Sequence, residues 1–206
     1  MRLWTLYLIV LAGFLAPLSS WAEDKAAGRR EKALLAGGCF WCIEAAYDTL
    51  PGVISAVSGY TGGRIKNPKY FAVVTGLTGH AESVEVVFDP EVISYRRILE
   101  IFWENIDPTQ EGGQFADRGS QYRTAIFYQS EEQRAEAEAS RRELQESGRF
   151  KRPLVTEILP AEEFYPAEEN HQDYHVKNAE SYERYAEASG RKAYVRSQRK
   201  GNKAVP

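Results

Sequence analysis

Apolar residues recur along this chain with the period of β-strands in several segments. Residues 33–36 form a short apolar run, and residues 53–60 are rich in β-branched and aromatic side chains. Residues 81–88 alternate, with Val84, Val86 and Phe88 on one side, and then reach the turn residues Asp89 and Pro90. Residues 122–128 and 154–159 are shorter runs of the same kind. We therefore predict a strand in each segment.

Other segments have the helical period. Residues 43–50 place apolar side chains one helical turn apart, at Ile43, Ala46, Tyr47 and Leu50. Residues 95–105 follow Ser94, a good N-cap, and present an inner face of Ile98, Leu99, Phe102 and Trp103. Residues 130–133 form a capping box that starts a polar helix to about residue 146, which must lie on the surface with one shallow inward stripe.

The predicted strands and helices do not follow one another as a regular series of strand-helix units, a pattern that predicts an α+β fold. We expect a two-layer sandwich, in which helices cover a mixed sheet, in one domain over residues 31–190. Two long glycine-rich segments, residues 59–70 and 107–121, interrupt this pattern and hold many Tyr, Asp, Gln and Arg side chains. Loops of that length in a small domain are usually functional.

The N-terminus has the pattern of a secretory signal peptide. Arg2 precedes an apolar run over residues 3–15, and Ser20 and Ala22 are small residues at the positions that a signal peptidase reads. We expect residues 1–22 to be removed and the mature protein to be exported, to a bacterial periplasm. An uncleaved membrane anchor is the alternative, although the run is short for a span and Pro17 follows it.

Charge and composition narrow the class. The chain of 206 residues is 43% hydrophobic and 27% charged, with a net charge of −3, which is typical of a globular domain and argues against a nucleic-acid partner. The basic segment 191–206 is the exception. We interpret it as a solvated, flexible tail, with a contact to anionic membrane or to a partner as the alternative.

Cys39 and Cys42 are the only cysteines, so any sulfur chemistry occurs there. They follow Gly38 and stand where the predicted helix begins. The N-terminus of a helix favours a thiolate, so we expect Cys39 to have a depressed pKa. Side chains three apart on a helix are neighbours, close enough for a disulfide that opens and closes. Two buried small hydrophobes, or a permanent structural disulfide, are the alternative interpretations.

Several short motifs occur in order between residues 34 and 178. They are Gly-Cys-Phe-Trp at 38–41, Gly-Tyr-Thr-Gly-Gly at 59–63, Gly-His-Ala-Glu at 79–82, Asp-Pro-Thr at 107–109, Asp-Arg-Gly-Ser-Gln-Tyr-Arg at 117–123 and Glu-Asn-His-Gln-Asp-Tyr at 169–174. Any one of them is weak evidence. In this order they resemble the motif series of the peptide methionine sulfoxide reductase A family.

The resemblance implies a reaction and roles for individual residues. Cys39 would attack the sulfur of methionine sulfoxide, free or in proteins, and become a sulfenic acid; type A enzymes take the S epimer. Glu82 would act as the acid that assists the departing oxygen, helped by the Tyr70 and Tyr122 hydroxyls. Asp117 matches a carboxylate that shapes the pocket. Phe40 and Trp41 would form the apolar wall for the S-methyl group.

Without the resemblance these residues have ordinary interpretations. Glu82 lies in an alternating strand, where it would by default face solvent, and a catalytic acid there requires a pKa raised by burial. Tyr70, Tyr122, Phe40 and Trp41 could equally belong to the core. His171 and His175, with the two cysteines, suggest zinc, but the two halves of that pattern are far apart. We expect no metal and no cofactor.

Position 42 departs from the commoner family pattern, which has glycine there and resolves the sulfenic acid with a cysteine near the C-terminus. This chain has no such residue, so Cys42 is the one internal thiol that can form a disulfide with Cys39. A thioredoxin-like dithiol would then reduce it, unless an external thiol attacks the sulfenic acid directly. We expect a monomer.

Two other functional classes remain open. The first is an exported thioredoxin-like thiol-disulfide oxidoreductase, which also places its two cysteines where a helix begins. Against it, Phe40 and Trp41 are bulky where such proteins carry small or polar residues, and Glu82 has no part in disulfide exchange. The second is a non-enzymatic binding module, which leaves the cysteine pair unexplained.

Overall fold

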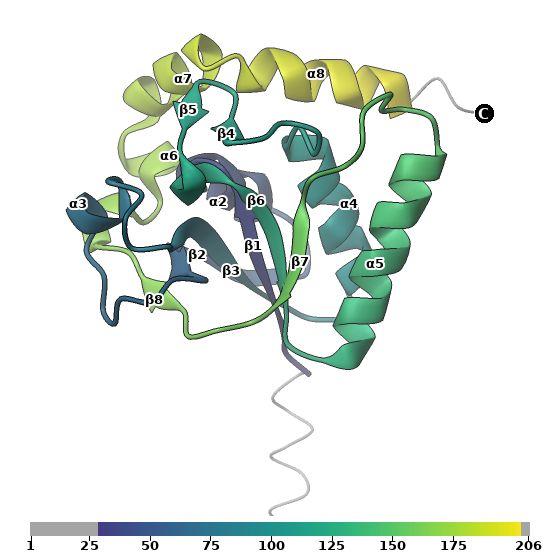
Figure 1. Cartoon of the computed structure of the whole chain (residues 1–206), viewed down its shortest axis with the longest axis horizontal. Coiled ribbons are helices and arrows are strands. Elements are labelled where there is room, and N and C mark those ends of the chain that lie inside the picture. Colours follow the sequence, from purple (N-terminus) through teal and green to yellow (C-terminus); the bar gives the residue numbers. More distant parts are fainter. Residues whose placement is uncertain (1–28, 203–206) are drawn as a thin grey trace, which may run out of the picture.

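A six-stranded mixed sheet organises the protein (Figure 1). The structure, a computed structural model, describes residues 29–202, with side chains to residue 198; the expected signal peptide lies outside these residues. The strand order is β7-β6-β1-β3-β2-β8, and every neighbouring pair is antiparallel except β6 and β7. The strands are β1 (Glu31–Gly37), β2 (Val53–Thr61), β3 (Ala81–Phe88), β6 (Thr124–Tyr128), β7 (Glu157–Pro160) and β8 (Tyr165–Pro166).

Helices connect and flank these strands. They are α2 (Phe40–Tyr47), α3 (Tyr70–Val73), α4 (Tyr95–Asn105), α5 (Glu131–Glu146), α6 (Tyr174–Lys177), α7 (Ala179–Ala188) and α8 (Arg191–Asn202). A two-stranded ribbon, β4 (Gly113–Gln114) with β5 (Asp117–Arg118), and 3-10 helices at Ser120–Tyr122 and Glu169–His171 lie in the loops. The expected α+β sandwich with a mixed sheet is confirmed.

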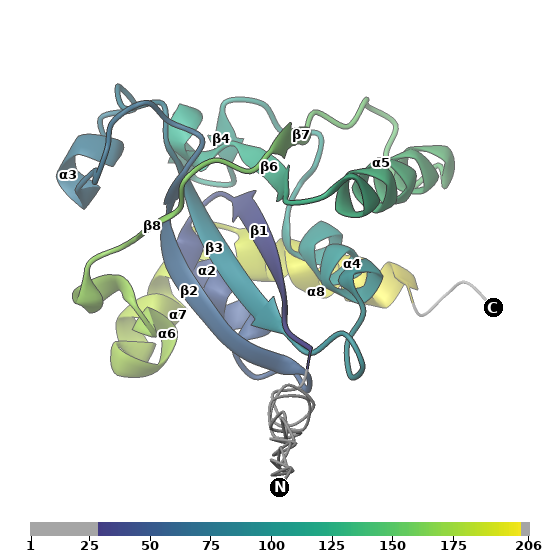
Figure 2. The same ribbon diagram turned by 90° about the horizontal axis from the view of Figure 1, so that it is seen from below.

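The alternation of β1 separates two apolar layers. Ala33 and Leu35 face the main core, which α2 and α4 complete with residues such as Ile43 and Phe102. Leu34 and Ala36 face a smaller cluster with Phe127. Figure 2 shows α2 and α4 on the same side of the central strands. Both faces of β1 are therefore buried, which explains why its sequence is a continuous apolar run.

The predicted helix starts are confirmed. Ser94 accepts a hydrogen bond from the Arg97 amide (3.1 Å), and Ser130 accepts one from the Gln133 amide (3.2 Å). Helix α5 buries only Ala137 and Ser140, in agreement with a surface helix that has one shallow stripe.

Two predicted strands begin later than expected. The segment from residue 122 starts as a 3-10 turn, so that β6 begins at Thr124, and residues 154–156 precede β7 as irregular chain. In the first case the backbone amide of Tyr122 donates a hydrogen bond to the carbonyl oxygen of Gly119 (3.0 Å) and not to a neighbouring strand. In the second, the Val155 amide bonds to the carbonyl oxygen of Pro108 (2.7 Å) in the long loop.

The interpretation of the C-terminal segment as a flexible tail is wrong for its first part. Residues Arg191–Asn202 form helix α8, which runs along the top of the view in Figure 1. Arg191 is only 4% exposed and donates hydrogen bonds to the carbonyl oxygens of Gly37 and Asn105, both 2.7 Å. A buried guanidinium with two buried acceptors anchors this helix, a role that the basic composition of the segment does not reveal.

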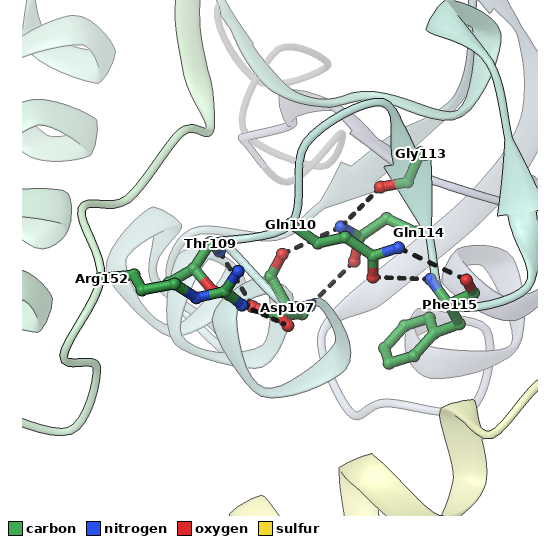
Figure 3. A network of polar contacts seen from close by, with 7 residues as sticks. All are labelled: Asp107, Thr109, Gln110, Gly113, Gln114, Phe115 and Arg152. Carbon is green, nitrogen blue, oxygen red and sulfur yellow. Dashed lines mark hydrogen bonds and ion pairs between the residues drawn. The ribbon is translucent and has the colours of Figure 1, made fainter.

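The long loop before β6 is held by its own side chains (Figure 3). Asp107 accepts hydrogen bonds from the amide and the hydroxyl of Thr109 (2.9 and 2.7 Å). The Gln114 side chain accepts from the Asp107 amide and donates to the Asp107 carbonyl oxygen, while Gln110 makes the same pair of bonds with Phe115. Arg152 adds a bond to the Thr109 hydroxyl (2.7 Å). These bonds fix the segment that leads to Asp117 and Tyr122.

Candidate active site

The two cysteines stand at the junction of β1 and α2, as predicted. Cys39 is the N-cap of α2, and Cys42 lies in its first turn; both are 5% exposed. Gly38, with φ +83°, makes the sharp turn before Cys39, and a Cβ there would lie 2.6 Å from Gln114 Cβ and 2.7 Å from Arg191 Nη2. Only glycine satisfies both the backbone conformation and this close approach.

Glu82 lies at the start of the adjacent strand β3 and reaches the same helix N-terminus. Its Oε2 accepts a hydrogen bond from the Phe40 amide (3.0 Å), and the residue is 2% exposed. Burial raises the pKa of Glu82 to about 8, although the bond from Phe40 opposes the shift. The default interpretation of a solvent-facing glutamate is therefore wrong. At neutral pH the side chain is mainly a neutral acid beside Cys39.

Tyr70, at the start of α3, and Tyr122, in the 3-10 turn before β6, complete this group. Each interacts electrostatically with Glu82, Cys39 and Asp117, so the loops bring their hydroxyls to the same place. Burial raises the pKa of Tyr70 to about 12 and that of Tyr122 further. Both hydroxyls therefore keep their protons and serve as hydrogen-bond donors.

Asp117 approaches from the β4-β5 ribbon. Its Oδ2 accepts a hydrogen bond from the hydroxyl of Tyr185 on α7, and the same hydroxyl also interacts with Cys39. The charge of Asp117 raises the pKa of Glu82 beyond the effect of burial. Asp117 thus favours the neutral form of Glu82 while it positions Tyr185 at the sulfur.

Phe40 and Trp41 have different environments. Phe40 is 1% exposed and belongs to the main core, with its ring 6.4 Å from that of Tyr70 and stacked on it. Trp41 is half-buried and stacks on Tyr174 at 3.8 Å between ring centroids. Of the two, Trp41 is the more accessible to a ligand.

The expected depressed pKa of Cys39 is not what the resting site shows. Burial raises the pKa of the Cys39 thiol, and the hydrogen bond with Cys42 and the negative charge of Cys42 raise it further. The same sulfur-sulfur hydrogen bond lowers the pKa of Cys42 to about 7, against the effect of burial. The amide of Phe40 at the helix N-terminus is already bonded to Glu82, which weakens the effect that the sequence predicts for Cys39. The interaction between the two sulfurs therefore favours one thiolate in the pair.

Sequence reasoning missed three residues on the C-terminal helices. Tyr185 bonds to Cys39, Tyr182 bonds to Cys42, and the charge of Arg191 lowers the pKa of Cys42. The two tyrosines are three apart and share a face of α7, but nothing distinguishes them from the other tyrosines of the chain. Only the folded structure brings α7 against α2.

The segment from residue 168 to residue 175 packs beside this site. Glu168 accepts hydrogen bonds from the Tyr70 amide (3.0 Å) and the Tyr60 hydroxyl (2.9 Å), which fixes the start of α3. His171 lies among the rings of Tyr70, Phe40 and Trp41, and burial lowers its pKa. His175 faces Asp48 (3.4 Å). Within residues 29–198 the structure groups no three His, Cys, Asp or Glu side chains in a way that could hold a metal ion.

Taken together, two hydrogen-bonded buried sulfurs beside a protonated carboxyl and tyrosine hydroxyls define a thiol-dependent oxidoreductase. The carboxyl and hydroxyls are proton-bearing groups beside the sulfurs, which simple disulfide exchange does not require.

Comparisons with known proteins identify the family. The family model described as peptide methionine sulfoxide reductase matches residues 31–203. A peptide methionine sulfoxide reductase MsrA of Listeria innocua is 54% identical over 171 residues, which cover 83% of this chain and 97% of the relative. The chain belongs to the peptide methionine sulfoxide reductase family and is an enzyme of the MsrA type.

Solved structures agree. Methionine sulfoxide reductase A of Corynebacterium diphtheriae is similar with a TM-score of 0.64 and 35% identity, covering 73% of this chain and 76% of that chain. Mxr1 of Saccharomyces cerevisiae in reduced form gives a TM-score of 0.69 and 31% identity, covering 73% of this chain and 87% of that one. The resemblance inferred from the motifs is thus confirmed.

Proposed function

We propose that the enzyme reduces methionine S-sulfoxide, free or in proteins, with Cys39 as the nucleophile and Glu82 as the proton donor. The observation that carries this assignment is the buried Glu82 carboxyl, which the Phe40 amide holds next to Cys39. A sulfoxide oxygen leaves only when it is protonated or strongly hydrogen-bonded. A carboxyl with a pKa of about 8 supplies that proton at neutral pH.

The first step moves the oxygen from the substrate to the enzyme. The thiolate of the cysteine pair is transferred to Cys39 when a proton moves along the hydrogen bond to Cys42. Cys39 then attacks the sulfoxide sulfur while Glu82 protonates the oxygen, and the Tyr70 and Tyr122 hydroxyls donate to it. The protonated oxygen then passes to the Cys39 sulfur as the bond between the two sulfurs breaks, so methionine leaves with the electron pair and Cys39 becomes a sulfenic acid.

The second step forms a disulfide. Cys42 is hydrogen-bonded to Cys39 and has a pKa of about 7, so it is well placed to attack the sulfenic acid and release water. An external dithiol of the thioredoxin type then reduces the Cys39–Cys42 disulfide. The free thiols in the structure correspond to the reduced enzyme that starts this cycle.

Intact mass after one equivalent of sulfoxide tests the second step. The wild type should lose two hydrogens, and Cys42→Ser should still release methionine but gain one oxygen that a sulfenic-acid reagent traps. Cys42→Ser should also lose turnover with a protein dithiol and keep turnover with excess dithiothreitol. A persistent gain of one oxygen in the wild type would show that an external thiol resolves the sulfenic acid.

We also propose that the enzyme works outside the cytoplasm. The support is the signal-like pattern of residues 1–22 alone. Among residues 29–202, no helix is both long and apolar enough to cross a bilayer. Fractionation of cells that produce the full-length chain, with the mature N-terminus sequenced, tests the proposal; cleavage after Ala22 is the expected result.

A further inference from the structure

A cleft of about 450 Å³ opens onto Cys42 on the side formed by the C-terminal helices. We call it the Cys42 cleft. Its walls include Ala45 and Ala46 of α2, Tyr182 and Ala186 of α7, and Val195 and Arg196 of α8. Cys39, Glu82, Tyr70, Tyr122 and Asp117 do not line it. Within the described residues, Cys42 is thus accessible from a place separate from the sulfoxide site.

Access to Cys42 but not to Cys39 suits reduction of a disulfide. A thiolate attacks a disulfide sulfur in line with the bond that breaks, so it must approach from the side opposite the leaving sulfur. The cleft reaches Cys42 and not Cys39. Attack from the cleft would therefore occur at Cys42 Sγ, with Cys39 as the leaving thiolate, which Glu82 can protonate because its carboxyl lies beside it.

The size of the cleft selects the reagent. Sites for small molecules typically have volumes of about 300–1,000 Å³, and the Cys42 cleft lies in that range. Cys42 itself lines the cleft and is only 5% exposed. A small thiol fits into a cleft of this size.

The charge of the cleft favours a thiol reagent of one charge over the others. Its lining holds the cations Arg191, Lys192 and Arg196 against one carboxylate, Glu183. Glu183 is paired with Lys192, and Arg196 pairs with Glu187 outside the lining (3.0 Å). Arg191 gives its hydrogen bonds to uncharged carbonyl oxygens. The net positive lining favours an anionic reagent over a neutral or cationic one.

We propose that the Cys42 cleft admits a small carboxylate-bearing thiol that reduces the Cys39–Cys42 disulfide by attack on Cys42. The inference rests on the proposed function, because it requires that disulfide, and it adds a second class of reductant to the protein dithiol. In the first step the thiolate forms a mixed disulfide with Cys42, and Cys39 takes both electrons of the broken bond. A second thiol then releases Cys42 and leaves as the symmetric disulfide.

The test measures reduction of the preformed disulfide by three thiols of different charge. The wild type is oxidised with one equivalent of methionine sulfoxide and mixed with 3-mercaptopropionate, 2-mercaptoethanol or cysteamine. Rate constants are divided by the thiolate concentration of each reagent and by the rate constant of the same thiolate with a small uncharged disulfide, because intrinsic nucleophilicity also varies with the pKa of the thiol. We expect the anionic thiol to react ~10-fold faster than the cationic one at low salt, with a smaller ratio at high salt. Equal rate constants would overturn the proposal.

Variants of the cleft test the location. Ala45→Leu places a larger side chain in the wall and should slow all three thiols, whereas Lys192→Gln with Arg196→Gln should remove most of the anionic preference. Arg142→Gln, an exposed change on the remote helix α5, is the matched control. Each rate is referred to the methionine released by the same preparation in one turnover, so that only folded enzyme is compared.

The outcomes separate the two proposals. If one equivalent of sulfoxide produces no disulfide, the proposed role of Cys42 fails and this inference fails with it. If the disulfide forms but neither cleft variant changes the rate constants, only the inference fails. If Ala45→Leu releases no methionine, the inference is tested by the variant with Lys192→Gln and Arg196→Gln and by the three thiols on the wild type.

Discussion

The carboxyl of Glu82 and the backbone amide of Phe40 are joined by a hydrogen bond of 3.0 Å, although the residues belong to different elements. The bond places a buried acid at the N-terminus of the helix whose N-cap is the nucleophile. It couples the position of the proton donor to the position of Cys39, because any shift of β3 against α2 separates them.

Replacement of Glu82 by glutamine should keep this bond and remove the proton. The amide oxygen of glutamine still accepts from Phe40, so the fold should survive. Since general acid assistance typically contributes ~10²–10⁴-fold, the rate of methionine release in a single turnover should fall by that factor. Glu85→Gln, on the same strand and paired with Lys32 at the surface, is the control and should stay near wild type. A loss under about threefold in Glu82→Gln would contradict the assignment.

The activity should decrease at the pH at which Glu82 loses its proton. Because burial raises the pKa of Glu82 to about 8, the acid is lost as the pH rises through that value. Single-turnover rates with saturating sulfoxide should therefore decline above about pH 8 in the wild type. The same limb should be missing from the much slower Glu82→Gln enzyme. A wild-type rate that is flat to pH 9.5 would show that Glu82 does not donate the proton.

The stability of the folded protein should also depend on the protonation of Glu82, and this contribution should fall as the pH rises. The pKa of Glu82 is about 8 in the folded protein against an ordinary value of 4.5, so the folded state binds more protons between these pH values. Its contribution is present in full below pH 4.5 and is lost as the pH rises through 8. Glu82→Gln should thus gain stability relative to wild type from pH 5 to pH 8.5, as measured by chemical denaturation at each pH. A constant difference between the two proteins would contradict this prediction.

Cys39→Ser should release no methionine even in one turnover, because serine is not ionised at this site and cannot form a sulfenic acid. The measurement is methionine release from one equivalent of sulfoxide by reduced enzyme. Cys42→Ser is the control, since it removes the second sulfur and leaves the first step possible. Methionine from Cys39→Ser would mean that another group attacks the sulfoxide.

Gly38→Ala should destabilise the enzyme more than Gly190→Ala, although both residues have φ +83°. The backbone conformation costs each alanine about 1–2 kcal/mol. A Cβ at Gly190 meets nothing within 4 Å, whereas one at Gly38 lies 2.6 Å from Gln114 Cβ. The added crowding should cost about 1–3 kcal/mol more, measured as the free energy of unfolding in urea. Equal losses would show that Gln114 and Arg191 move aside.

Local pattern predicted much of this fold and part of the site. The alternation of residues 81–88 gave strand β3, and the serine caps gave the starts of α4 and α5. The same alternation predicted that Glu82 faces solvent, whereas the residue is buried. A period of two shows which residues share a face, but both faces of this sheet are covered near β1 and β3, and that depends on distant segments.

The acidity of Cys39 was mispredicted for a related reason. A helix N-terminus can be read from sequence, but burial by α7 and a hydrogen bond to a second thiol cannot. The helical fold of Arg191–Asn202 was missed because its basic composition resembles a solvated tail, while the two carbonyl acceptors of Arg191 come from elsewhere in the chain.

The contact between Arg191 and Gly37 also has a consequence for the order of events during biosynthesis. The two residues are 154 positions apart, and Tyr185 must travel almost as far to reach Cys39. An emerging chain therefore exposes its cysteines long before the helices that enclose them have been synthesised. The reactive pair is enclosed only after Tyr185 and Arg191 have joined the fold, so a fragment that stops before α7 holds both cysteines and the acid but lacks the environment in which they react.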